Sequence, residues 1–147
     1  RFLGPLQNVV VDQATGVAPS MYMHFLGVAG SGFTLTNCVG SSGVYGIWRD
    51  PALTTSGLPV LQDKFPTGLT VGGCVISQQG SGVFFVPGEN ILTPVNDAAV
   101  GFVNTATYDY ELSGSSPYLT SGVGGQLPGC DYTSCRPLWA AARDTEV

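Results

Sequence analysis

Charge is scarce in this sequence: charged side chains make up 10% of its 147 residues, against roughly 25% in typical soluble chains. The five basic residues are also scattered along the chain and not clustered: Arg1, Arg49, Lys64, Arg136 and Arg143. Nucleic-acid backbones require clustered Lys and Arg, because affinity comes from the release of their counterions. With a formal net charge of −5, no nucleic-acid partner is expected.

Long apolar runs are missing as well. No stretch reaches the roughly 18 residues needed to cross a bilayer, and no basic amphipathic segment suits a lipid surface. We therefore expect no direct membrane partner for the sequence as it stands. Because it starts at Arg1 and not at Met, we expect a processed or truncated product.

Motifs for catalysis are equally sparse. His24 is the only histidine, and no local pattern supplies it with a nucleophile and an orienting carboxylate. No nucleophile elbow or phosphate-binding loop occurs, and only Asp109 and Glu111 are spaced to share one strand face. The sequence predicts a non-enzymatic protein with no cofactor and no metal. A small secreted hydrolase remains open, because active sites that arose by convergence need not leave local motifs.

The chain does contain four cysteines, Cys38, Cys74, Cys130 and Cys135. Zinc sites require close pairs such as Cys-x-x-Cys, and that spacing is absent. We favour disulfides over buried free thiols: Cys130 with Cys135 would close a short loop, and Cys38 with Cys74 would join two apolar segments. Disulfides would place the protein in an oxidising compartment.

Hydrophobic residues are plentiful at 44%, and 21 glycines with many Ser and Thr residues separate them into short runs. This punctuation predicts a mainly β fold, with antiparallel sheets or a sandwich of about eight to nine short strands. The candidate strands are 20–26, 33–39, 44–48, 59–62, 69–76, 82–86, 99–103, 107–112 and 118–123. We expect one domain over residues 1–147, and we find no internal repeat.

Both ends of the chain carry specific expectations. Residues 1–13 have apolar positions near the helical period, which predicts the end of an N-terminal helix. Its apolar face, which we expect to pack against neighbouring subunits, comprises Phe2, Leu3, Leu6, Val9 and Val10. Residues 127–147 would form the Cys130–Cys135 loop and a tail.

Aromatic residues are the candidate binding groups. Most are expected in the core or in cross-strand pairs. Tyr118, Tyr132 and Trp139 lie near predicted loops, where they could contact a carbohydrate or a protein.

The order of these features resembles the GspH/FimT family of type IV minor pilins and type II secretion pseudopilins. The similar segments are residues 16–18 followed by 21–26, the pair 65–71 and 82–88, and the Cys130–Cys135 loop. The resemblance implies a β-rich head after an N-terminal helix, in a cell-surface filament subunit that assembles with other protein subunits. Membrane contact would come only through a helix ahead of Arg1. The basic C-terminal stretch of DNA-binding family members has no counterpart.

A second hypothesis fits the composition equally well. A viral capsid protrusion, or another adhesive β-domain that binds a host receptor or glycan, would also combine low charge with Gly- and Ser-rich loops. Either hypothesis places the protein outside the cell, on a cell surface or on a virion.

Overall fold

The computed structural model describes residues 2–3, 6–17, 23–26, 29–43, 46–49, 58–78 and 91–132. Within these ranges the chain forms twelve strands, two α-helices and two short 3₁₀ helices. The prediction of a mainly β, strand-rich fold is confirmed.

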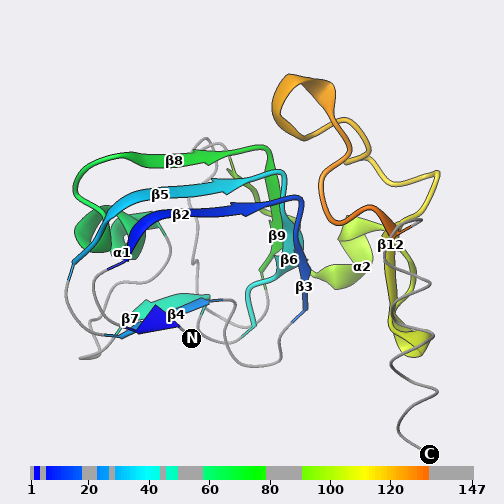
Figure 1. Ribbon diagram of the computed structural model, residues 1–147. Helices are drawn as coiled ribbons and strands as arrows, with labels where there is room; N and C mark the ends of the chain where they lie inside the picture. The colour runs from blue at the N-terminus through cyan, green and yellow to red at the C-terminus, as the bar shows by residue number, and fades with distance from the viewer. Residues whose placement is uncertain are drawn as a thin grey trace, which may run out of the picture.

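Three parallel ladders form the body of the molecule, as Figure 1 shows. The first contains β1 (Phe2–Leu3), β4 (Met23–Leu26) and β7 (Ile47–Arg49). The second contains β2 (Gln7–Asp12), β5 (Ser31–Thr36) and β8 (Leu69–Gly72). The third contains β3 (Thr15–Gly16), β6 (Val39–Ser41), β9 (Cys74–Ser77) and β10 (Ile91–Leu92). The chain visits the ladders in turn, so each circuit is one coil of a parallel β-solenoid.

The coils repeat although the residues do not. Asp12 pairs with Thr36, 24 positions further along, and the Val9–Phe33 pair has the same separation. The sequence contains no internal repeat that we could find, whereas the structure repeats its coil. An inward position of a coil requires an apolar side chain, and an outward position accepts many side chains. The same coil geometry can therefore recur without recurrence of the same residue types.

The pairing direction also differs from the prediction. The three ladders are parallel, and only β11 (Phe102–Asn104) and β12 (Asp109–Leu112) pair antiparallel among the described strands. Antiparallel sheets were expected because short apolar runs were separated by turn residues. In the solenoid the turns lead to the next ladder of the same coil and not back along the same sheet.

The expected helix at the N-terminus is not formed, since Phe2–Leu3 and Gln7–Asp12 are strands of the first coil. The β-branched run at Val9, Val10 and Val11 favours extended backbone, and β5 supplies a parallel partner for it. Leu6 and Val9 have helical spacing but both pack against the core of the coil, on either side of Asn8, whose φ is 54°.

Several predicted strands have another structure or lie outside the described ranges. Residues 59–62 belong to helix α1 (Leu58–Lys64), where Pro59 is tolerated because it lies in the first turn. Residues 99–103 span the end of α2 (Asp97–Val100) and the start of β11. Residues 118–123 form turns that lead into the 3₁₀ helix η2 (Val123–Gly125), and residues 82–86 are not described.

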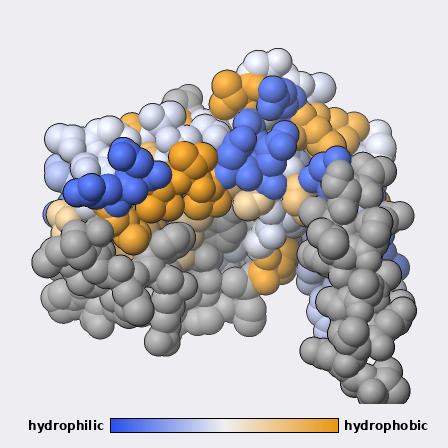
Figure 2. All heavy atoms as spheres, in the orientation of Figure 1, coloured by the Kyte–Doolittle hydropathy of each residue, from blue (hydrophilic) through white to orange (hydrophobic). Residues whose placement is uncertain are grey.

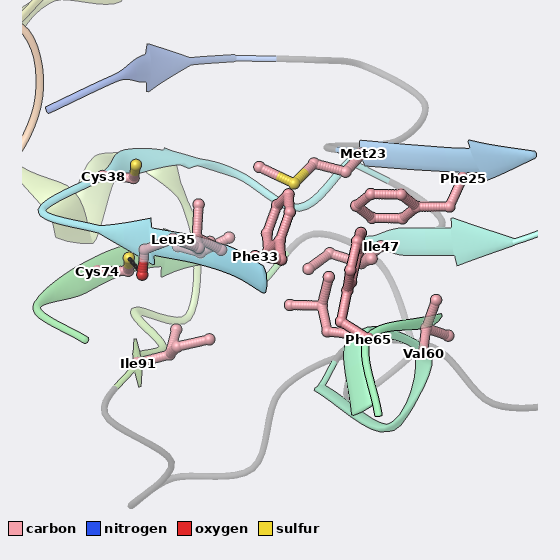
Figure 3. Close-up of a cluster of buried hydrophobic side chains, with 12 residues drawn as sticks. Met23, Phe25, Phe33, Leu35, Cys38, Ile47, Val60, Phe65, Cys74 and Ile91 are labelled. Atoms are coloured by element: carbon pink, nitrogen blue, oxygen red, sulfur yellow. Dashed lines mark hydrogen bonds between the residues drawn. The ribbon is translucent and has the colours of Figure 1, made fainter. Parts of the chain in front are cut away.

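The interior of the coils is apolar. Phe33 and Leu35 point inward from β5 and are fully buried, while the alternate residues Thr34 and Thr36 point outward. The Phe33 ring stacks on that of Phe65, which follows α1, at 4.6 Å between centroids. Figure 3 shows these side chains meeting others from β4, β7 and α1 in one cluster.

A second apolar cluster lies on the other face of the β6–β9 sheet. Val39 and Val75 point away from the coil interior and contact Val100 of α2 and Leu112 of β12. The Ser77 hydroxyl also donates a hydrogen bond to a carboxylate oxygen of Asp97, which lies in the first turn of α2. Residues 97–132 therefore cover one outer side of the solenoid, to the right in Figure 1.

The cysteines occupy two different settings. Cys38 and Cys74 lie in adjacent coils, both fully buried, and no disulfide joins them. The Cys74 thiol donates instead to backbone carbonyl oxygens, that of Gly72 at 3.4 Å and that of Leu35 at 3.6 Å. The predicted Cys38–Cys74 cross-link is thus replaced by stacked, hydrogen-bonded thiols. Cys130 forms no disulfide with any described residue, and Cys135 lies outside the described ranges.

Candidate functional site

Two surfaces are candidate sites: the open edge of the first coil and a cleft beside β12. Among the described strands, the strand of the first coil is terminal in each ladder, so β1, β2 and β3 all present an edge on the same side. Figure 2 views this side and shows apolar surface over β2 between two hydrophilic regions. Val10 of β2 is 66% exposed.

The predicted assembly face falls on this edge. Leu6 and Val9 are only partly buried against the core, whereas Phe33, the partner of Val9 in the second coil, is fully buried. Phe2 and Leu3 lie in β1 at the edge of the next ladder, where their backbones pair with Phe25 and Leu26. The five residues therefore share the first coil: Leu6 directly precedes β2, the other four lie on strands, and none lies on the expected helix.

The far end of the same ladder is β8, which has a described partner only on its β5 side. A hollow of about 650 Å³ lies beside β8. Thr70 and Val71 of β8, Leu92 of β10 and Val123 of η2 line it together with neighbouring glycines. At the opposite end of the ladder, the edge of β2 has no partner among the described strands and offers backbone to a further strand.

The cleft beside β12 is smaller, with a volume of about 310 Å³. The corner between β2 and β3 contributes Gln13 and Thr15 to its lining. Strand β12 contributes Tyr110, Glu111 and Leu112, and the segment 127–132 completes the lining.

Hydrogen bonds hold the segment 127–132 against the solenoid. The backbone amide of Cys130 donates to Thr15 Oγ1 at 3.0 Å, and the amide of Gly129 donates to the carbonyl of Asn37 at 2.7 Å. Gly129 has a φ of 93°, and a Cβ there would lie 2.8 Å from Thr15 Oγ1. Only glycine fits, so the cleft has a preformed wall.

Tyr132 lies buried at this cleft. Its pKa is raised above the ordinary tyrosine value, chiefly because burial disfavours the charged phenolate and additionally because Cys130 is close by. The phenol therefore stays neutral to a more alkaline pH than an exposed tyrosine does.

An aromatic row leads out of the cleft. The ring of Tyr110 packs edge-on against that of Phe102 at 5.5 Å and against that of Tyr108 at 6.5 Å. Tyr108 is 72% exposed, and it holds a φ of 60° at the end of the 3₁₀ helix η1 (Thr105–Thr107). A bulky non-glycine residue in this conformation is unusual, and it directs a large ring into solvent.

The predicted binding aromatics do not form one patch. Tyr118 is half-buried and packs against the Val39–Val75 cluster, whereas Tyr132 is buried at the cleft. Trp139 lies outside the described residues. The sequence pattern did not select Tyr108 and Tyr110 for binding, because residues that alternate along a strand look the same whether they lie in a core or beside a cleft.

The histidine of this sequence is placed by its backbone alone. His24 lies on β4 opposite Trp48, and its side chain is not among the described ones. Within the described ranges, no group of three or more His, Cys, Asp or Glu side chains is arranged to hold a metal ion. None of the helices there is long and apolar enough to cross a membrane.

Comparison with protein-family models, curated protein sequences and solved structures finds no match to this chain.

Proposed function

We propose that this protein is a non-enzymatic structural subunit that works outside the cytoplasm and assembles with other protein subunits into a filament. The observation that carries the proposal is the exposed edge of β2, which is a terminal strand of the β2–β5–β8 ladder among the described strands. If this edge pairs with a different surface of the next copy, the ladder continues across the junction. Such a head-to-tail contact does not close on itself and so generates a linear assembly.

Burial supports this arrangement. The inward residues of the first coil, such as Val9, remain partly buried, while their second-coil counterparts are fully buried. A further coil placed over β2 would remove that apolar surface from water. The low charge of the sequence also favours association over repulsion between copies.

A pilus or pseudopilus component, as the resemblance to minor pilins implies, is the kind of filament subunit we propose. The contact would differ from the one expected from the sequence, because a strand edge takes the place of a helix. The protein would lie at a cell surface, where a filament of this type is displayed.

Sedimentation velocity and negative-stain electron microscopy of the purified chain at increasing concentration test this proposal. We expect linear oligomers that lengthen with concentration. Val10→Lys should abolish them, because a charge on an edge strand blocks pairing. Val95→Lys is the matched control, since Val95 is similarly exposed but lies outside every strand. A monomer at all concentrations, or assembly that Val10→Lys does not change, would refute the proposal.

The second candidate is an adhesive β-domain that binds a receptor or glycan on a host, including the case of a capsid protrusion. The exposed ring of Tyr108 beside a preformed cleft favours it. The two functions are compatible, because the cleft and the edge of β2 involve different residues.

A further inference from the structure

We infer that the hollow beside β8 binds an uncharged amphiphile, a hydrocarbon chain with a hydroxyl group at its head. The hollow has a volume of about 650 Å³, which lies within the range of small-molecule sites. The inference is independent of the proposed assembly, because β8 lies at the opposite end of its ladder from the edge of β2.

Two large apolar side chains face this hollow from different elements. Leu92 of β10 is 47% exposed and Val123 of η2 is 52% exposed, and both are lining residues. Ile91, which precedes Leu92 in the same strand, also contributes to the lining and is almost fully buried. A hydrocarbon chain in the hollow would remove Leu92 and Val123 from water, and the gain in free energy increases with the apolar area covered.

The walls of the hollow are held in place by the fold itself. The side-chain oxygen of Asn37 accepts a hydrogen bond from the Val123 amide at 2.7 Å. Gly73, which lines the hollow, lies so close to this segment that a Cβ there would be 2.5 Å from the Val123 nitrogen. Gly72, the last residue of β8, also lines the hollow and has no side chain to fill it. Because the hollow is formed before a ligand arrives, binding requires little ordering of the protein.

The polar side chains of the lining are hydroxyls. Thr70 and Ser121 each contribute one, and neither hydroxyl forms a hydrogen bond with a described residue. The third, that of Thr36, donates to an Asp12 carboxylate oxygen. No charged side chain occurs among the described lining residues. A hydroxyl head can exchange hydrogen bonds with Thr70 or Ser121, whereas a carboxylate head would lose hydration without gaining a cation from this lining.

A fatty acid is the competing ligand, because its hydrocarbon chain is the same and only its head is charged. Decanol and decanoate at neutral pH separate the two possibilities. We expect decanol to bind about tenfold more tightly, since the lining offers hydrogen bonds but no opposite charge.

Isothermal titration of the purified full chain with hexanol, octanol and decanol is the direct test. We expect saturable binding of one molecule per chain, with an affinity that increases about threefold for each added CH₂ group. Leu92→Asp should weaken the binding of decanol about tenfold or more, because it places a charge on an apolar wall. Val103→Asp is the matched control, since Val103 is 49% exposed but is not a lining residue of the hollow.

Val123→Asp tests the hollow from the side of η2 and should weaken decanol binding to a similar extent. Both side chains are about half exposed, so both variants should fold, and an unchanged thermal transition would verify this. Val10→Lys, the variant that tests assembly, should leave decanol binding unchanged. Three results would overturn the inference: no saturable binding of any of the alcohols, unchanged binding by both Asp variants, or decanoate binding as tight as that of decanol.

Discussion

The side-chain oxygen of Asn37 accepts a hydrogen bond from the backbone amide of Val123 at 2.7 Å, across 86 positions of sequence. Asn37 turns the corner between β5 and β6 with a φ of 52°, a conformation that asparagine tolerates better than most residues. Its amide nitrogen also donates to an Asp12 carboxylate oxygen at 2.9 Å, so one buried side chain joins two coils and the C-terminal segment.

Replacing Asn37 tests the importance of this junction. We expect Asn37→Ala to lower the free energy of unfolding by about 3 kcal/mol. Buried hydrogen bonds are lost, and alanine tolerates the left-handed backbone less well than asparagine does. Urea denaturation measures the change. Gln13 occupies the same corner in the first coil with a φ of 48°, and it is exposed. Gln13→Ala should therefore change stability by less than about 0.5 kcal/mol. Equal effects at both corners would contradict this role of Asn37.

Gly73, at the third corner, should tolerate no side chain. Its φ is 62°, and a Cβ there would lie 2.5 Å from the Val123 amide nitrogen. Gly73→Ala should cost about 3 kcal/mol, the sum of backbone strain and displacement of the contacting segment. Gly124 has a φ of 70°, but a Cβ there would meet nothing within 4 Å, so Gly124→Ala isolates the strain at about 1 kcal/mol. Thermal and urea unfolding of both variants would measure the two losses of stability. Similar losses for Gly73→Ala and Gly124→Ala would refute the close approach of Val123 to Gly73.

The buried thiol of Cys74 should make the protein sensitive to alkali. Its pKa is raised above the ordinary value, first by the hydrogen bond with Cys38 and second by burial. In the unfolded chain the thiol deprotonates at about pH 8.5, while in the folded protein it stays neutral. Stability is therefore full below that pH and falls above it, by up to about 1.4 kcal/mol per pH unit.

The measurement is the urea midpoint as a function of pH, together with thiol labelling. Cys74→Val should reduce the loss of stability between about pH 8.5 and about pH 10, because the titrating thiol is gone. Native protein should resist a thiol reagent at Cys38 and Cys74 until it unfolds. Rapid labelling of both in the folded state would show that the thiols are accessible, contrary to their burial.

Val100 should control the attachment of residues 97–132 to the solenoid. Its side chain is fully buried against Val39 and Val75. Val100→Ala should cost about 2 kcal/mol, from lost burial and the cavity that remains. Hydrogen exchange followed by mass spectrometry should show faster exchange in residues 97–132 and little change in β5. A uniform increase over the whole chain would mean that the two clusters unfold as one unit.

Local chemistry determined much of what the sequence predicted. Short β-branched and aromatic runs predicted extended backbone at 33–39 and 69–76, because extended backbone is a preference of single residues and their neighbours. The structure divides each of these predicted strands into two at a corner, at Asn37 and at Gly73. The sequence also indicated the apolar character of Phe2, Leu3, Leu6, Val9 and Val10. It did not indicate that they lie on an edge strand, because a helix stripe and a coil corner can share the same spacing.

Only the tertiary structure decided the direction of pairing and the composition of the candidate site. An inward–outward alternation is identical in parallel and antiparallel strands, so the choice depends on contacts between residues such as Val9 and Phe33, a full coil apart. The cleft likewise unites Thr15 with Cys130, which are 115 positions apart. No local pattern records such a meeting, because it depends on how the whole chain folds around its core.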